Sequence, residues 1–262
     1  MYILSTSIPN DLFQAAYFIF MKYAPLFIFG AKNTLIIALS STLIGLVIGL
    51  GVGIIKTLPI SSSDPLIKRL FIRFIRLITS IYVEIFRGTP MMVQAVFIYY
   101  SLNGLFSSSR ILAGIFIVSI NTGAYMAEII RSGIQSLDNG QNEAARSLGM
   151  SNFQTMVFVV LPQAIRNAFP AIGNEFVVNI KDTSVLTVIG ISELFFQANS
   201  IAGSIYKFKE TFFVAAAVYL FLTYSTTLVL KYIERKMNMT GYDGPSSSTT
   251  PLITAHFKGE TS

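Results

Sequence analysis

Long stretches without any charged residue constrain this chain more than any other feature of its sequence. No Asp, Glu, Lys or Arg occurs in residues 33–55, 88–109, 111–127 or 211–230. A helix needs roughly 20 mostly apolar residues to cross the hydrocarbon layer of a membrane. Charged residues make up only 12% of the 262 positions, against about 25% in soluble domains. The sequence therefore predicts an all-α integral membrane protein with one transmembrane helix from each stretch.

A fifth transmembrane helix is expected over residues 155–180, where the apolar character is weaker. It is interrupted by Pro162, Arg166, Pro170 and Glu175. Polar residues at membrane depth usually have a structural or functional reason, because burying them in lipid is costly. We therefore predict five spans within a transmembrane domain at residues 28–237.

The two ends of the chain are expected to lie outside this domain. Residues 12–30 contain Lys22 and Pro25, so we expect residues 1–27 to form an amphipathic lead-in helix rather than a sixth span. The last segment, residues 238–262, is rich in Gly, Pro, Ser and Thr, which is typical of a disordered tail.

The basic residues predict how the chain is oriented. With five spans and the N-terminus outside, ten Lys and Arg residues fall in cytoplasmic segments and six in outer segments, as the positive-inside rule requires. We therefore expect a multi-pass protein of the bacterial cell membrane with a cytoplasmic C-terminal tail. No basic stripe with interleaved aromatic residues occurs in a soluble segment, so nucleic-acid binding is not expected. The chain has no cysteine and one histidine, and we expect no thiol chemistry and no metal site.

A polar segment at residues 138–162 separates two of the predicted spans. Asp138 and Ser151 are each followed three residues later by a glutamine, which is the pattern of a capping box at a helix N-terminus. Gly149 lies where a helix would end in a left-handed turn. The sequence therefore predicts a short helix over residues 139–148, a glycine stop and a newly capped membrane helix.

The residues of this short helix leave two interpretations open. Ala144 and Ala145 form a small face that another surface can approach closely, and they are flanked by Glu143, Arg146 and Leu148. The helix is either an ordinary polar surface helix or an element that docks on a partner. Its caps by themselves indicate only a rigid polar helix that projects from the cytoplasmic side.

The same segment resembles a known motif. Bacterial ATP-binding-cassette import permeases carry the EAA motif Glu-Ala-Ala-x3-Gly-x9-Ile-x-Leu-Pro, and it is matched here, with valine in place of isoleucine, by Glu143, Ala144, Ala145, Gly149, Val159, Leu161 and Pro162. Residues 83–100, 120–151 and 174–194 resemble the polar amino-acid permeases of the histidine and glutamine uptake type. The likeness covers roughly residues 28–237.

This resemblance implies a five-helix permease that works as a dimer with the same or a homologous permease subunit. It also implies two ATPase subunits on the cytoplasmic side, an extracytoplasmic solute-binding protein and a polar amino acid as substrate. The EAA helix is then a coupling helix in a groove of the ATPase, formed by Glu143, Ala144, Ala145, Arg146, Leu148 and Gly149. Gly149 and Pro162 would shape the joint between this helix and the membrane span.

The resemblance assigns ATP hydrolysis to the partner. The chain has no Gly-x4-Gly-Lys-Ser/Thr loop, the phosphate-binding motif of such ATPases. We therefore expect this chain to bind no cofactor of its own, and ATP and Mg to be used by the partner ATPase.

Polar residues inside the predicted spans are candidates for a substrate pathway. The fourth and third spans place them on helical faces, at Asn174, Glu175, Lys181, Asp182, Asn121 and Tyr125. An amino acid presents an ammonium and a carboxylate, which these side chains can meet in a wet cavity. In the alternative interpretation they hold helices together, with asparagines bonding between spans and Glu128 pairing with Arg131. Both interpretations stay open, the first favoured for Glu175 and the second for the asparagines.

A bend is predicted just before the second span. Glu84 and Arg87 are three residues apart and are spaced to pair on a helix. Pro90 follows and cannot donate a helical hydrogen bond. We expect Pro90 to mark a structural hinge.

A different functional class also remains open on the sequence alone. A secondary transporter or channel would need an ion site or a filter within this chain, and secondary carriers often show inverted repeats. No convincing repeat occurs here, and five spans enclose a pathway poorly without a partner. The sequence therefore favours the paired, ATP-driven permease.

Overall fold

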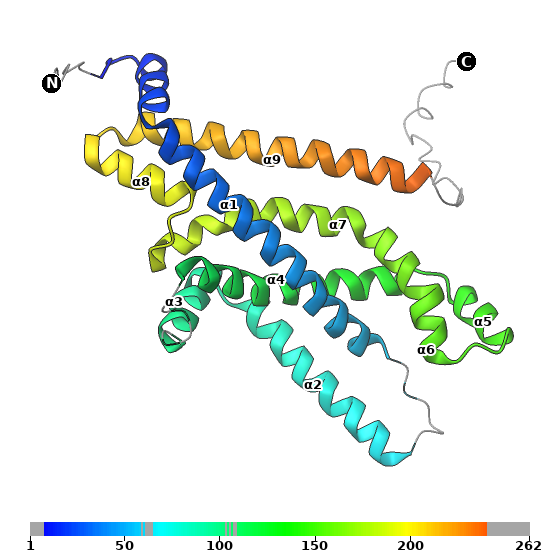
Figure 1. Cartoon of the computed structure of the whole chain (residues 1–262). Coiled ribbons are helices and arrows are strands. Elements are labelled where there is room, and N and C mark those ends of the chain that lie inside the picture. Colours follow the sequence, from blue (N-terminus) through cyan, green and yellow to red (C-terminus); the bar gives the residue numbers. More distant parts are fainter. Residues whose placement is uncertain are drawn as a thin grey trace, which may run out of the picture.

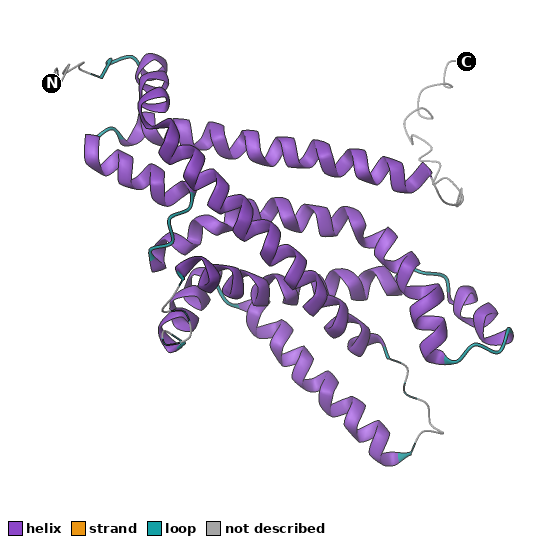
Figure 2. Ribbon diagram, viewed as in Figure 1, coloured by secondary structure: helices purple, strands orange, loops and turns teal. Residues whose placement is uncertain are grey.

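All regular structure among the described residues is helical (Figure 2). The computed structural model describes residues 8–58, 60, 65–102, 104, 106 and 109–239. In chain order the helices are α1 (Leu12–Thr57), α2 (Leu66–Gly88), α3 (Met91–Ser101), α4 (Arg110–Gln135), α5 (Asn139–Ser147), α6 (Asn152–Gln154), the π-helix η1 (Thr155–Val160), α7 (Leu161–Asp182), the 3-10 helix η2 (Thr183–Ile189), α8 (Leu194–Ile205) and α9 (Phe208–Met239).

The first helix joins the expected lead-in to the first span. Asp11 caps α1, its carboxylate accepting hydrogen bonds from the amides of Phe13 and Gln14, both at 3.1 Å. The helix then runs for 46 residues, with one non-helical residue at Tyr23 (φ −111, ψ 15). Pro25 explains the kink, because its ring clashes with the preceding turn and it has no N–H to donate. The lead-in is therefore a bent extension of the span and does not end at residue 27.

A row of glycines lets α1 lie directly against α4. Gly45, Gly49 and Gly53 are spaced four apart and face Thr122, Met126 and Ile130, which are also spaced four apart. A Cβ added to Gly49 would stand 2.3 Å from the Cβ of Met126. Small residues at this spacing are how membrane helices approach closely without a hydrophobic driving force.

The second expected span, residues 88–109, begins at a break between two helices. α2 ends at Gly88 and α3 begins at Met91, with Thr89 (φ −120, ψ 148) and Pro90 (φ −64, ψ 134) extended between them. Proline disfavours helical geometry in the residue before it, which accounts for the break at Thr89. α3 has only 11 residues and is too short to cross a membrane by itself, so the single span predicted here is not confirmed.

Four helices of the described chain are long and apolar enough to cross a membrane. They are α1, α4, the continuous helical run of residues 152–189, and α9. These helices lie beside one another, with α1 crossing α4 and α7 and with α8 at one end of the bundle (Figure 1). α5 lies at the opposite end, where α4 ends and the run toward α7 begins (Figure 1).

Several apolar clusters along this bundle build the core. One joins α1, α8 and α9 through buried residues such as Phe27, Leu194 and Val214. A second joins α1, α3, α4 and η2 through residues such as Ile117 and Leu186. A third joins α4 and α7 through Met126, Ile130 and neighbouring residues. α9 continues to Met239, so the predicted tail of residues 238–262 overlaps its last turn. The remainder of that tail, like residues 1–7 of the lead-in, lies outside the described residues.

Candidate functional site

α5 is a short capped helix that projects at one end of the bundle. Asp138 caps it, its carboxylate accepting a hydrogen bond from the amide of Gly140 at 2.7 Å. The side-chain half of the expected capping box is absent from the described contacts, because Gln141 bonds to Asp138 only through its backbone amide, at 3.1 Å to the carbonyl oxygen. The cap at Asp138 is therefore confirmed, in a simpler form than the spacing predicts.

The predicted coupling residues lie mostly on the open side of α5. The exposed residues are Glu143, Ala144 and Arg146, whereas Ala145 is buried. Leu148 has 84% of its surface exposed, which is unusual for a leucine next to a polar helix. The helix therefore presents one free face with a protruding apolar side chain.

Gly149 ends this helix as the sequence predicts. Its φ is +81, in the left-handed region, and no atom lies within 4 Å of where a Cβ would be. The amide of Gly149 donates to the carbonyl of Arg146 at 2.9 Å, and the amide of Met150 donates to that of Ala145 at 3.2 Å. These two bonds satisfy carbonyls at the helix end, as in a Schellman motif.

The membrane helix begins again at Ser151. The hydroxyl of Ser151 accepts from the amide of Gln154 at 3.2 Å, and the Gln154 side chain accepts from the amide of Ser151 at 2.9 Å. This is the predicted capping box. Six residues of π-helix follow at η1, immediately before Pro162 at the start of α7.

The π-turn has a physical cause in Pro162. A proline ring clashes with the carbonyl four residues earlier in a regular α-helix, and the wider π-turn relieves such a clash. The amide of Leu161 donates to the carbonyl of Met156, five residues back. The helical run bends here between α6 and α7 (Figure 1), so the joint between the projecting helix and the span is a defined turn.

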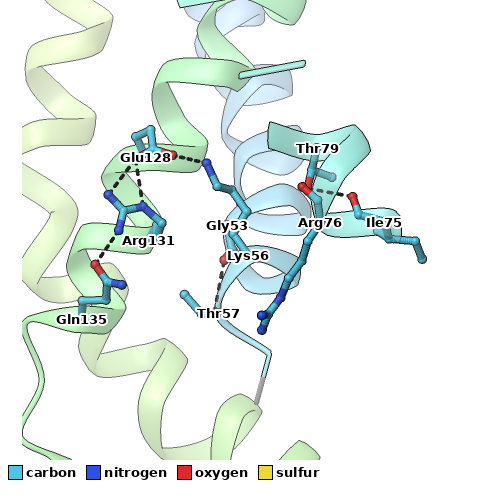
Figure 3. Close-up of polar contacts among 9 residues, drawn as sticks. All are labelled: Gly53, Lys56, Thr57, Ile75, Arg76, Thr79, Glu128, Arg131 and Gln135. Atoms are coloured by element: carbon cyan, nitrogen blue, oxygen red, sulfur yellow. Dashed lines mark hydrogen bonds and ion pairs between the residues drawn. The ribbon is translucent and has the colours of Figure 1, made fainter. Parts of the chain in front are cut away.

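A charged cluster ties α1 to α4 near the same end. The Glu128 carboxylate lies 2.5 Å from Nζ of Lys56 and 2.8 Å from the guanidinium of Arg131. Arg131 also donates to the side chain of Gln135 at 2.6 Å. The pairing of Glu128 with Arg131 is thereby confirmed, and Figure 3 shows that Lys56 reaches the same carboxylate from α1.

Arg76 extends this connection to α2. Its guanidinium donates to the backbone carbonyls of Ile55 and Leu58 at the end of α1. Those carbonyls have no partner within the helix, because a helix leaves its last four carbonyls unsatisfied. The C-terminal end of α1 is therefore linked by side chains to both α2 and α4.

The predicted pathway residue Glu175 has a different environment. It is half-buried on α7, within electrostatic range of Asp182 on its own helix and of Arg87 on α2. Among the described residues it forms no ion pair. The guanidinium carbon of Arg87 lies 5.5 Å from the ring centroid of Tyr125 on α4, and no described ion pair joins Arg87 to Glu84.

These contacts connect charges of both signs across three helices. The carboxylate of Glu175 is within electrostatic range of Asp182 and Arg87, and Arg87 lies over the ring of Tyr125. The sequence pattern made Glu175, Asp182 and Tyr125 pathway candidates. It assigned Arg87 only a local pairing with Glu84, so the contact of Arg87 with Tyr125 was missed.

Asn121 forms hydrogen bonds at the break between α2 and α3. Its amide donates to Oε1 of Gln94 at 2.8 Å and to the carbonyl of Phe86 at 3.2 Å. Gln94 in turn donates to the carbonyls of Phe86 and Thr89, at 3.0 and 2.9 Å. Two side chains thus satisfy backbone acceptors that the break at Thr89 and Pro90 leaves free.

The remaining polar residues of α7 divide between two faces. Asn179 is buried and bonds to hydroxyls on two other helices, Thr42 at 2.8 Å and Thr122 at 3.1 Å. Asn174 and Lys181 are exposed, and Asn174 lines a groove of about 240 Å³ between α7 and α9. Asn174 and Lys181 therefore do not share the environment of Glu175.

Glu193 is a buried carboxylate that the sequence pattern did not single out. It is 0% exposed and accepts four hydrogen bonds, from the amides of Phe195 and Phe196 and from the hydroxyls of Thr187 and Tyr219. It caps α8 and links it to η2 and α9. Its signal in the sequence is a lone acidic residue directly before an apolar helix.

The described residues contain no cluster of three or more metal-binding side chains. The chemistry of the site rests on charge, hydrogen bonding and the projecting helix.

Comparisons with known proteins agree on one family. The family described as "Binding-protein-dependent transport system inner membrane component" matches residues 66–239. The glutamine transport system permease protein GlnP of Escherichia coli (strain K12) is 36% identical over 218 residues, which cover 82% of this chain and 94% of that protein. The arginine transport system permease protein ArtQ of Bacillus subtilis (strain 168) is 34% identical over 215 residues, covering 81% and 93%.

Solved structures show the same fold. A crystal structure of an amino acid ABC transporter with histidines matches with a TM-score of 0.72 and 39% identity, over 87% of this chain and 99% of that chain. An inward-facing conformation of the MetNI methionine ABC transporter matches with a TM-score of 0.70 over 82% and 98% of the two chains. At 19% identity the second match concerns the fold alone.

Proposed function

The chain belongs to the binding-protein-dependent transport system inner membrane components, and we propose that it is the permease subunit of an ATP-driven importer of polar amino acids. The observation that carries this proposal is the exposed helix α5, capped at both ends and joined through a π-turn to a membrane helix that bears the unpaired Glu175. A separate ATPase needs a projecting helix through which it can act on the pathway. A secondary transporter or channel that works without an ATPase does not need one.

In this proposal α5 is the coupling helix. Glu143, Ala144, Arg146 and Leu148 supply the exposed face that enters a groove of a separate ATPase, while buried Ala145 and left-handed Gly149 fix its shape. ATP with Mg is hydrolysed by two such ATPase subunits. Closure of the ATPase pair moves α5, and the turn before Pro162 passes the movement to α7.

The substrate pathway runs past Glu175, Asp182, Arg87 and Tyr125. An amino acid carries an ammonium that the carboxylates can bind and a carboxylate that the guanidinium can bind. Asn174 lines the groove toward α9 and is assigned to a second wall. Lys181 follows seven residues later and is assigned to the same wall. A second permease subunit, the same or homologous, completes the pathway, and an extracytoplasmic solute-binding protein delivers the amino acid.

The proposed topology has five crossings. α2 and α3 together make the crossing that a single straight helix does not, with Pro90 as the hinge between them. The N-terminus lies outside, and α5 and the C-terminal tail lie in the cytoplasm. The excess of Lys and Arg in these cytoplasmic segments supports this orientation.

Replacing Gly149 with valine tests the coupling assignment. A β-branched residue does not readily adopt φ +81, so the end of α5 should distort. We expect Gly149→Val to abolish substrate-stimulated ATPase activity and uptake of glutamine and arginine in vesicles that contain the permease, its ATPase and its binding protein. Insertion into the membrane should continue, as measured by the amount of protein extracted.

The matched control is Gly51→Val. Gly51 also has open space around its Cβ position but lies within α1 without a positive φ. This variant should transport normally. Normal coupled ATPase activity in Gly149→Val would remove α5 from the coupling role, and uptake without ATP would remove the proposed function itself.

A further inference from the structure

A long apolar groove lies between α9 and the N-terminal half of α1, away from the charged cluster at Lys56. Its volume is about 810 Å³, within the roughly 300–1,000 Å³ of typical ligand sites. Every residue that lines it is aliphatic or aromatic, with the exception of Lys32. The groove is therefore a hydrophobic trench with a single positive charge.

The kink in α1 builds this groove. At Tyr23 the helix bends, so that its first turns meet α9 again at Phe13 and Phe213, whose rings pack edge to face with centroids 5.6 Å apart. Phe27 and Val214 form the floor and are only 1% and 5% exposed. The ring contact at one end and the buried residues along the floor keep α1 and α9 apart where the groove lies.

The single charge has no partner within the described chain. Lys32 is exposed, and it forms no ion pair with any described residue. No acidic residue lines the groove. The groove therefore complements a molecule that is apolar along its length and negatively charged at one end.

We propose that this groove binds one anionic phospholipid, with an acyl chain in the trench and the phosphate on Nζ of Lys32. The groove opens on helices that span the membrane, where such lipids are the solvent. Lysine reaches a headgroup easily, because its long stem packs on apolar surface while its ammonium extends to the interface. An extended peptide is excluded as occupant, because its backbone groups would have no hydrogen-bond partners in an apolar trench.

The experiment measures lipid retained by the purified protein. The wild-type chain is reconstituted in vesicles with equal amounts of phosphatidylglycerol and phosphatidylcholine and is then extracted in a mild detergent. Native mass spectrometry measures the mass of the protein with any lipid that stays bound. We expect one retained phospholipid per chain, mostly phosphatidylglycerol. Lys32→Gln should lower the preference for phosphatidylglycerol by about fivefold, the effect of one basic residue at a membrane surface. Lys22→Gln is the control, since Lys22 is exposed on the same helix outside the groove.

A second pair of variants tests the trench itself. Ala217 and Ala216 are neighbouring exposed residues on α9, and only Ala217 lines the groove. Ala217→Trp should fill the trench and remove the retained lipid, whereas Ala216→Trp should keep it. Retention of lipid by Ala217→Trp, or an unchanged lipid preference in Lys32→Gln, would overturn the proposal. If Ala217→Trp, but not Ala216→Trp, changes the number of chains per particle, the groove binds a second copy of this chain. That result would also overturn the lipid proposal.

Discussion

Two glutamates in the apolar helices of this protein have opposite surroundings. Glu128 on α4 is held by Lys56 at 2.5 Å and by Arg131 at 2.8 Å. Glu175 on α7 is half-buried and has no ion pair among the described residues, although Arg87 lies within electrostatic range. One carboxylate is fully engaged by the protein, and the other is left available.

We interpret this difference as one between a structural charge and a charge that is available to a ligand. A charged side chain at membrane depth costs about 2.5–3.5 kcal/mol on insertion scales. Glu128 offsets that cost through contacts that join α1 to α4. Glu175 forms no such contact among the described residues, so we expect its carboxylate to be open to a cationic group of a ligand.

The comparison is tested most strongly at Glu128. Removing its carboxylate in Glu128→Ala leaves Lys56 and Arg131 facing each other without a counter-charge, and breaking such a partly buried pair costs about 3 kcal/mol. We expect the free energy of unfolding, measured by SDS titration of the purified protein, to fall by that amount. Glu84→Ala is the control, because Glu84 is exposed and its loss should change stability by less than about 0.5 kcal/mol. Equal stability of the two variants would contradict a structural role for the carboxylate of Glu128.

Asn121 sharpens the comparison, since the sequence pattern made it a pathway candidate together with Glu175 while favouring a bonding role between spans. Asn121→Leu should leave the carbonyl of Phe86 and Oε1 of Gln94 with fewer partners, at a cost of about 1–3 kcal/mol. The same SDS titration measures this loss. The ratio of arginine to glutamine uptake should stay unchanged, and a shift in that ratio would return Asn121 to the pathway.

The smallest loss of stability is expected at Glu175. Glu175→Gln removes a charge without breaking an ion pair among the described residues, so the free energy of unfolding should not fall. Transport should respond instead, with cationic amino acids weakened relative to neutral ones by about 1–3 kcal/mol, the strength of a charge-assisted hydrogen bond. Vesicle uptake of whichever substrates the binding protein delivers measures this. Unaltered rate and affinity for all of them would show that Glu175 is not in the site.

The features that the sequence predicted are those decided by neighbouring residues. Ser151 with Gln154, Gly149, and Glu128 with Arg131 each act within a few positions, so their spacing is enough to predict the contact. The family resemblance supplied the function, which local spacing did not.

The features that were missed depend on residues far apart in the chain. Lys56 reaches Glu128 across 72 positions, and Asn121 meets Gln94 across 27. Neither contact leaves a periodic pattern. The bend in α1 at Tyr23 was missed for a related reason, because counting uncharged residues does not register a proline that disturbs a helix. The break between α2 and α3 lies at Pro90, where the sequence predicted a bend.

The turn at Gly149 depends on the chirality of the residue at that position. With φ at +81 and open space on all sides, the position does not require a small residue within this chain. It requires a backbone of the opposite hand, which L-amino acids adopt at a cost and D-amino acids adopt naturally. Glycine, the one achiral residue available to the ribosome, is how a chain of uniform handedness obtains that geometry. A D-alanine at the same place would adopt this backbone geometry without the strain that an L-residue meets.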